Sequence, residues 1–317
     1  WFIMSTIKLK ENERENLVKI AYWYYKRNLT QAEIAKRLGY TRQKVNQIIG
    51  SLIDLGIVEI NINGLTEDFA ELEYAIENRF NLKRVCIINS DSHSKDEFYR
   101  KAAETIDAIF DNNQTIGLSW GETLGQTVQA MHPHTLKNSS VVQLAGGLNS
   151  HSSIVRPDEI TRLLAKKLNC AYHILYAPAF VDSAEAREII VQENTVQETF
   201  SRMKECDLAI LGVGELSDTS TLHKEGFFPQ NFLNKLISEG CVGDIAMLPF
   251  KADGTWYPLD NIVGIDKETL GAIPNVVILA QGVNKAAAVL GAIHTGCVDT
   301  VIIDKNIAKQ ISKQYNL

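Results

Sequence analysis

The first sixty residues place hydrophobic side chains at helical spacing in three separate segments. The first predicted helix covers residues 13 to 27, where every third or fourth residue is hydrophobic. A second, shorter helix is expected after Thr30, because Thr30 and Glu33 have the spacing of a capping box, in which each side chain satisfies a backbone N–H of the other residue. Gly39 should end this helix, since glycine adopts the left-handed conformation there at little cost.

A third helix is predicted from Thr41 to about Leu55, which completes the layout of a helix-turn-helix. At about 100° per residue, its hydrophobic side chains fall on one side and its amide side chains on the other, with Arg42 and Lys44 on the flanks. Amide and guanidinium groups match the hydrogen-bonding edges of adenine and guanine in the major groove. The residues predicted to contact DNA are Thr30, Gln31, Thr41, Arg42, Gln43, Lys44, Asn46 and Gln47.

The charge of the chain is divided unevenly. Residues 4–63 contain ten Lys and Arg against six acidic residues, a net charge of +4, whereas the remainder carries −10. Lysine and arginine gain affinity for nucleic acids by displacing counterions from phosphates, so this asymmetry favours a DNA contact at one end of the chain. A solvated polar face on a helical-bundle domain is the alternative. The capping box, the short turn and the charge together favour the helix-turn-helix.

Two features follow the third predicted helix. Residues 55–62 alternate in apolar character, which predicts a strand or a small wing. A connector helix is then expected over residues 64–82, where hydrophobic residues form a heptad-like seam. This seam fits a dimerising helix and a helix lying on the next domain equally well, because two heptads do not establish a coiled coil. The seam consists of Leu65, Phe69, Leu72, Ile76 and Phe80.

Residues 83–317 alternate short apolar runs with helix-period stretches. This alternation predicts an α/β domain with a doubly wound, mostly parallel sheet that helices cover on both faces. The predicted strands begin at Arg84, Thr115, Val141, Tyr172, Leu208, Asp244, Val276 and Val301. The predicted helices span residues 97–110, 122–131, 158–168, 184–191 and 285–293.

Glycine and small polar residues follow several of the predicted strands, at the edge where such sheets bind ligands. The clearest case is the strand-to-helix turn of residues 117–123, whose amides would face an anion at a helix N-terminus. Lys285, close after Gly282, would add a positive charge. The predicted ligand-binding residues are Gly117, Ser119, Trp120, Gly121, Thr123, Gly146, Gly147, Gly212, Gly214, Asp244, Gln281, Gly282 and Lys285.

Taken together, these segments resemble the SorC/DeoR-type bacterial regulators over nearly the whole chain. That resemblance implies an N-terminal helix-turn-helix joined to a sugar-sensing domain, related in fold to glucosamine-6-phosphate deaminase and ribose-5-phosphate isomerase. The motifs that carry it are Gly117-x-Ser119-Trp120-Gly121-x-Thr123, Ala177-Pro178 with Asp182, Gly212-x-Gly214, Gly243-Asp244-Ile245 with Asp253-Gly254, and Gly282-x-x-Lys285 through Asp304.

The resemblance also implies a function. It predicts a transcriptional regulator of a carbohydrate-utilisation operon that binds double-stranded operator DNA and a sugar or sugar-phosphate effector, with L-sorbose operons as the first expectation. The phosphate would lie against Ser119, Gly121, Thr123 and Lys285. The family more often has two glycines where this chain has Gln281-Gly282. A homo-oligomer, a dimer or a tetramer, is expected.

Two enzyme classes are alternatives. Residues 117–121 also fit the GxSxG turn of serine hydrolases, with Asp266 and His294 in the order of a triad. A sugar-phosphate isomerase or deaminase, which the larger domain resembles, would need an acid or base in the pocket. The candidates for that role are Asp182, Glu215 and Asp244. Neither enzyme class has a use for a helix-turn-helix.

The predicted domains are therefore residues 4–63, the connector 64–82, and residues 83–317. Met4 is expected to be the native start, with no signal peptide and no apolar run of the length that spans a bilayer, so we expect a cytoplasmic protein without membrane contact. The five cysteines are widely spaced and form no CxxC pair, which predicts no cysteine-built metal site. No cofactor is expected.

Overall fold

The computed structural model describes residues 11–59, 69–90, 95–147, 156–218, 220–224 and 228–317. Its contacts divide the chain into two compact units, Trp1–Thr66 and Glu67–Leu317. We call them the N-terminal unit and the larger unit. The helix expected in the connector belongs, by these contacts, to the larger unit.

The N-terminal unit folds as three helical segments around one small core. Helix α1 (Glu11–Ala21) continues directly into a π-helical turn, η1 (Tyr22–Lys26), and is followed by α2 (Gln31–Leu38) and α3 (Arg42–Ser51). The buried residues of this core come from all three helices and the turn after α3, and they are Ile20, Ala21, Ile34, Ala35, Val45, Ile49 and Leu52. The order and packing of the elements confirm the predicted helix-turn-helix.

The ends of α2 follow the sequence prediction, whereas the end of α3 does not. Thr30 and Glu33 form the capping box, with the Thr30 N–H donating to Glu33 Oε2 at 2.8 Å, and Gly39 ends α2 with φ +67°. The prediction that the third helix runs to about Leu55 is wrong. It ends at Ser51, because the chain turns and the Leu52 carbonyl accepts the N–H groups of residues 57 and 58.

The predicted wing is largely untested. Residues 57–59 form no strand, and residues 60–62 lie outside the described part of the chain.

Helix α4 (Ala70–Phe80) carries the predicted seam, of which Leu65 also lies outside that part. Ile76 is buried in the core of the larger unit, with Phe69, Leu72 and Phe80 packed against it. The seam therefore packs against the larger unit. This favours a helix that lies on the next domain over a dimerising helix.

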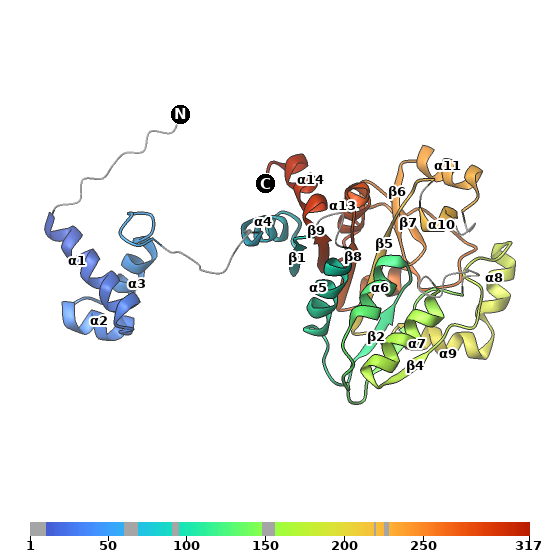
Figure 1. Ribbon diagram of the computed structural model, residues 1–317, viewed down its shortest axis with the longest axis horizontal. Helices are drawn as coiled ribbons and strands as arrows, with labels where there is room; N and C mark the ends of the chain where they lie inside the picture. Colours follow the sequence, from blue (N-terminus) through green and yellow to red (C-terminus); the bar gives the residue numbers. More distant parts are fainter. Residues whose placement is uncertain (1–10, 60–68, 91–94, 148–155, 219, 225–227) are drawn as a thin grey trace. The chain divides into compact units, whose positions relative to one another are not determined.

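The larger unit is built on one mixed sheet (Figure 1). Seven of its strands run in the order β1-β9-β8-β5-β2-β3-β4, and every pairing along this path is parallel. These strands are β1 (Arg84–Ile88), β2 (Thr115–Leu118), β3 (Ser140–Gln143), β4 (Ala171–His173), β5 (Leu208–Glu215), β8 (Asn275–Ala280) and β9 (Thr300–Asp304). Each coincides with an apolar run that the sequence marks as a strand.

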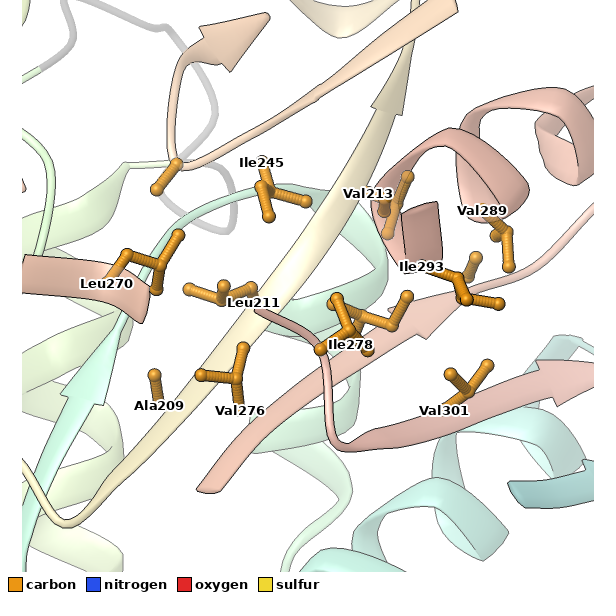
Figure 2. Packing of buried hydrophobic residues seen from close by; sticks show 14 of the residues in the cluster. Ala209, Leu211, Val213, Ile245, Leu270, Val276, Ile278, Val289, Ile293 and Val301 are labelled. Carbon is orange, nitrogen blue, oxygen red and sulfur yellow. The ribbon is translucent and has the colours of Figure 1, made fainter. Parts of the chain in front are cut away.

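Helices cover both faces of this sheet, as a doubly wound fold requires. Alternate residues of β5 point to opposite sides: Leu211 and Val213 enter one core, and Ile210 enters the other. Figure 2 shows part of the first core, where Ile293 of helix α13 (Ala286–His294) lies beside Ile278 of β8. Helices α4, α9 (Asn194–Met203), α12 (Lys267–Ala272) and α14 (Lys305–Tyr315) also contribute to it.

The second core lies under helices on the opposite face. Its buried side chains come from α5 (Lys95–Asp107), α6 (Glu122–Ala130), α7 (Pro157–Leu168), α10 (Thr221–Lys224) and α11 (Gln230–Ser238). Helix α8 (Ala184–Val191) buries none of its side chains fully. The periodicity of the sequence did not single out α9, α10, α11, α12 or α14. Within the described ranges, no helix combines the length and the apolar composition needed to cross a bilayer.

One predicted strand belongs to a different structure. The run that starts at Asp244 is not a parallel strand of the main sheet: β6 (Cys241–Ile245) pairs antiparallel with the end of β5 and, through a tight turn, with β7 (Leu248–Lys251). Two neighbouring strands separated by two residues can only form a hairpin, because a parallel crossover needs a dozen or more residues. Ala246 and Met247 in this turn both have positive φ.

Candidate functional site

The exposed face of α3 carries most of the side chains predicted to contact DNA. Thr30, Thr41, Arg42, Gln43, Lys44, Asn46 and Gln47 are exposed, and Gln31 is half-buried. Val45 and Ile49 on the opposite face are buried, which fixes the orientation of the helix in its unit. The Thr41 side chain caps α3 by accepting the Lys44 N–H at 3.2 Å. Basic and amide groups are thus presented together at the start of α3.

Two contacts hold this face in one shape. Gln31 Nε2 donates to Asn46 Oδ1 at 3.0 Å and so ties α2 to α3, while the Lys44 ammonium lies 4.4 Å from the centre of the Tyr40 ring. A shallow groove is lined by Gln31, Arg42, Gln43 and Asn46. Side chains held in place in this way lose less conformational entropy when they bind.

The larger unit has a cavity of about 520 Å³ at the carboxyl ends of its parallel strands. Its wall comes from segments far apart in the sequence, which follow β1, β2, β8 and β9 and include the end of β5. The uncharged part of the wall includes Ser90, Tyr99, Trp120, Gly121, Thr123, Gly212, Gly214, Ser220, Thr221, Gln281, Gly282, Asn284 and Asn306. The charged part consists of Glu122, Glu215, Asp244, Asp304, Lys95, Lys224 and Lys285.

Two helices begin at this cavity. Gly121 is the N-cap of α6 with φ +122°, a conformation that side chains rarely adopt, and it leaves the first amides of α6 without a side-chain cap. Asp304 is the N-cap of α14 and accepts the N–H groups of Asn306 at 2.7 Å and Ile307 at 3.0 Å. Its other carboxylate oxygen accepts the N–H of Gly282. The free amides at α6 are suited to an anion.

Asp244 is a buried charged residue of the cavity wall, with 3% of its surface exposed. Its Oδ2 accepts the Met247 N–H at 3.2 Å, whereas Oδ1 has no hydrogen-bond partner among the described residues. Burial raises the pKa of Asp244 to about 7, although the Met247 hydrogen bond and the charge of Lys285 act in the opposite direction. A Cβ at Gly214 would overlap Asp244 Oδ1. Any residue other than glycine at position 214 would therefore force the Asp244 carboxyl to move.

Lys285 supplies a positive charge among the acidic residues of the cavity. It follows Gly282, whose φ of +101° starts the short η2 helix (Val283–Lys285). Burial lowers the pKa of Lys285, while the nearby carboxylates of Glu215, Asp244, Glu122 and Asp304 raise it. An anion that enters the cavity would therefore find the half-buried Lys285 cation and the amides of α6 that no side chain caps.

Nine of the thirteen predicted ligand-binding residues line this cavity, and four do not. Ser119 is buried, and its Oγ accepts the Gly212 N–H at 3.2 Å. Gly117 lies inside β2, where a Cβ would be 2.9 Å from the Leu144 side chain. Gly146 and Gly147 pair with neighbouring backbone, and a Cβ at Gly146 would be 2.7 Å from the Ala179 backbone. These glycines allow close packing of the chain beside the cavity.

Several cavity residues were missed by sequence reasoning. Among the charged groups these are Glu122, Asp304, Lys95 and Lys224. Glu122 directly follows Gly121, and Asp304 is the last residue of β9 and of the quoted motif, so the rule that selected Gly121 also points to both. Lys95 and Lys224 lie on helices of the cavity rim, and only the three-dimensional fold brings them to the site.

The structure does not assemble the hydrolase triad. Ser119 Oγ accepts a backbone N–H, Asp266 caps α12 by accepting the Thr269 N–H at 2.6 Å, and His294 Nδ1 lies 2.8 Å from the Ala252 carbonyl oxygen. Of the acid–base candidates, Glu215 and Asp244 line the cavity and Asp182 does not. Within the described ranges, no group of three or more His, Cys, Asp or Glu residues is arranged to hold a metal ion.

Comparisons with known proteins agree with this architecture. Residues 66–313 match the Sugar-bind family, described as "Putative sugar-binding domain", and residues 22–63 match the MarR family. The chain is 25% identical over 310 residues to the deoxyribonucleoside regulator of Bacillus subtilis, covering 95% of this chain and 98% of that protein. It is 29% identical over 308 residues to the transcriptional regulator LsrR of Escherichia coli strain K12, covering 94% and 95%.

A solved structure shows the same fold over both units. The full-length sorbitol operon regulator SorC from Klebsiella pneumoniae has a TM-score of 0.74 at 22% identity, and the match covers 95% of this chain and 99% of that one. The family match takes in most of the chain and the whole larger unit except its C-terminal end, residues 314–317. The chain therefore belongs to the Sugar-bind family and has the two-part architecture of the SorC- and DeoR-type transcriptional regulators, an N-terminal helix-turn-helix followed by a sugar-binding α/β domain.

Proposed function

We propose that this chain regulates a carbohydrate-utilisation operon by binding operator DNA through α3, and that a phosphorylated sugar bound in the cavity controls this binding. One observation carries the proposal: a single chain joins a basic, amide-rich helix-turn-helix to a cavity whose wall offers a cation, free helix amides and several carboxylates. Family membership supports a regulator over an enzyme, because the relatives named above are transcriptional regulators.

The anionic end of the effector would lie between Lys285 and the start of α6. The amides at Gly121 and Thr123 and the Lys285 ammonium provide the donors that a phosphate needs. The carboxylates of Glu122 and Glu215 would accept hydrogen bonds from sugar hydroxyl groups. Ser119, Gly117, Gly146 and Gly147 do not line the cavity, so our proposal leaves them out of direct contact with the effector.

The DNA-binding residues of the proposal are those on the exposed start of α3, together with Thr30 and Gln31 at the start of α2. Arg42, Gln43 and Asn46 would contact base edges, since residues near the start of a recognition helix are the ones that reach bases. Lys44 and the cap residues would contact phosphates. A helix-turn-helix usually binds a two-fold symmetric site as a dimer, so we propose a homo-oligomer, a dimer or a tetramer, in the cytoplasm.

A sugar-phosphate isomerase or deaminase is the second candidate. Asp244, whose pKa burial raises to about 7, is a buried carboxyl beside the cavity that can exchange a proton near neutral pH. Turnover of ribose 5-phosphate or glucosamine 6-phosphate that is lost in Asp244→Asn would establish this activity. We propose instead that the chain has no enzymatic activity, so both substrates should remain unchanged.

The proposed effector site can be tested by thermal shift and by DNA binding. A panel of free and phosphorylated pentoses and hexoses, L-sorbose 1-phosphate included, should contain a phosphorylated member that raises the melting temperature, because a ligand that binds only the native state stabilises it. The wild-type chain should change its affinity for its own promoter fragment when that ligand is added.

Lys285→Ala should remove this response while leaving the affinity for DNA without effector intact. Lys267→Ala is the matched control, because Lys267 lies on α12 outside the cavity and its ammonium is 3.7 Å from Glu268. A full effector response in Lys285→Ala would contradict the assignment of Lys285. Absence of any ligand from the whole panel would contradict the sugar-phosphate proposal itself.

A further inference from the structure

Asp304 links the cavity wall to helix α14. Its side chain is 2% exposed, and both carboxylate oxygens are used: Oδ1 accepts the N–H groups of Asn306 and Ile307 in the first turn of α14, and Oδ2 accepts the N–H of Gly282. Gly282, Asp304 and Asn306 all line the cavity. A ligand that shifts the Gly282 backbone therefore acts on the same carboxylate that begins α14.

Helix α14 is packed along one face against the first core. Ile307, Ala308 and Ile311 on one face are buried in the first core, and the eleven residues of the helix span about 16 Å at 1.5 Å per residue. Close packing resists bending, so a displacement at its first turn shifts the helix as a whole rather than being absorbed along it.

The last turn of α14 contacts the last turn of α4. The Tyr315 ring meets the Phe80 ring edge-on, with centroids 5.0 Å apart, and the Arg79 guanidinium lies 5.3 Å from the centre of the Tyr315 ring. His294 supports the pair, because its Nε2 is 3.4 Å from Tyr315 Oη and its ring lies 5.9 Å from Phe80. Tyr315 is thus the aromatic contact between the last turns of α14 and α4.

Besides the burial of Ile76 in the first core, two sets of contacts hold helix α4. Glu73 and Glu77 accept the N–H groups of Ile87 and Val85, each at 2.7 Å, and fasten the helix to the edge of β1. Phe80 fastens its last turn to α14. In the sequence, α4 is the first helix after the segment that leads from the N-terminal unit. Along the backbone, α4 therefore lies between the helix-turn-helix and all the segments that line the cavity.

We propose that α14 couples the cavity to α4: a ligand that engages the Gly282 loop changes the position of α14, and Tyr315 passes the change to Phe80 and Arg79. This inference extends the proposed function, since it names the element by which the effector would influence the DNA-binding unit. It differs from a general allosteric change because it assigns the coupling to one helix and one aromatic contact.

A cycle of variants in the full-length chain tests this coupling without any effector or DNA. The readout is hydrogen exchange of the α4 backbone amides, residues 70–80. Asp304→Asn keeps the size of the side chain, and with Oδ1 still capping α14 it replaces the oxygen that accepts the Gly282 N–H by an NH2 group, which cannot accept it. We expect exchange in α4 to change by on the order of threefold to tenfold in Asp304→Asn, and the same substitution to have no further effect in a Tyr315→Ala background.

The matched control is Asp266→Asn, which alters the aspartate cap of α12, a helix of the same core, and should leave exchange in α4 unchanged. Phe110→Ala, an aromatic truncation in the second core, controls for a general loss of stability. Unchanged α4 exchange in Asp304→Asn would overturn the inference. An equal effect of Asp304→Asn with and without Tyr315 would also overturn it, because the coupling would then bypass the aromatic contact.

Inorganic phosphate serves as the ligand probe in a second arm. In the wild type it should alter exchange in both the Gln281–Lys285 segment and α4, and in Tyr315→Ala only in the first. If phosphate alters the cavity segment but never α4, the coupling inference fails and the proposed site stands. If phosphate alters neither, the proposed anion site fails, whereas the variant cycle still decides the coupling.

Discussion

The two candidate sites differ in how the chain builds them. The proposed DNA-binding face takes its residues from one stretch of the sequence, Thr30 to Gln47, and keeps all of them except the half-buried Gln31 exposed. The cavity draws its wall from residues spread between Ser90 and Asn306, and buries the carboxyl of Asp244. The first site depends on local helix geometry, and the second depends on the whole sheet being in place.

The two sites also use charge differently. Exposed basic groups on α3 act through a field that salt screens over about 8 Å at physiological ionic strength. The cavity acts through desolvation, which shifts the pKa of Asp244 upward and that of Lys285 downward. DNA binding should therefore respond to salt, and the cavity should respond to pH.

We expect the largest effect from Asp244, on the pH dependence of the stability of the larger unit. Its native pKa, about 7, lies above the ordinary 3.8, so between these values the unfolded chain releases a proton that the native protein keeps. Stability of the larger unit should fall as pH rises through this window and level off above it, by on the order of 4 kcal/mol at most. Asp244→Asn should remove this fall.

Calorimetric unfolding of Asp244→Asn and wild type from pH 4 to 8 measures the effect, with Asp260→Asn, an exposed aspartate, as the control. The same pH dependence in Asp244→Asn and in wild type would show that Asp244 is not the buried acid that the structure places beside the cavity.

Independence of the two units is tested by Ile34→Ala in the small core of the helix-turn-helix. Ile34 is fully buried, and such truncations cost about 2–5 kcal/mol, which a unit of this size tolerates poorly. DNA binding should be lost, while the thermal transition of the larger unit stays unchanged. Ile237→Ala, at an isoleucine that is 45% exposed on α11, should shift stability by about 0.5 kcal/mol or less. If both units unfolded together in Ile34→Ala, the two units would not be independent.

The choice of the α3 face is tested by Arg42→Ala and Gln43→Ala. Each should weaken binding to the operator by about 1–3 kcal/mol if the side chain contacts a base edge. Arg202→Ala on α9, whose guanidinium is 2.8 Å from Glu205, is the control and should bind DNA normally. Fluorescence anisotropy at two salt concentrations measures both affinities. Normal binding in the two α3 variants would mean that another face contacts DNA.

The smallest effect concerns the capping box. Thr30→Ala removes the side-chain oxygen that accepts the Glu33 N–H at 3.3 Å, and should lower the stability of the N-terminal unit by about 1 kcal/mol. Thr30→Ser keeps the hydroxyl and should be close to neutral in urea unfolding. Equal losses in the two variants would point to the methyl group rather than the cap.

The features that the sequence predicted correctly are those that depend on residues close together along the chain. Capping residues and hydrophobic spacing located α2 and the start of α3, and continuous apolar runs located the seven parallel strands. The hairpin of β6 and β7 was missed because Asp244–Met247 reads as one more buried run, and only Ala246 and Met247 with positive φ reveal the turn. The end of α3 was misplaced because Leu52 and Leu55 keep the helical spacing after the helix has ended.

For the cavity, the glycines that follow predicted strands identified the correct edge of the sheet. They did not show which of these glycines line the cavity. Gly121 and Gly282 have positive φ and line the cavity, whereas Gly146 serves backbone packing against Ala179. Sequence cannot separate these roles, because both require the absence of a Cβ. The carboxylates of Glu122 and Asp304 were missed because their importance follows from facing Lys285 across the fold.

The carboxylates of Glu73 and Glu77 have a consequence for handling the larger unit as a fragment. By accepting the N–H groups of β1, they occupy backbone donors that an open sheet edge would offer to another chain. A fragment that begins at residue 83 would lose α4 and uncover an apolar terminal strand, inviting edge-to-edge aggregation. An isolated sugar-binding domain should therefore start before Phe69.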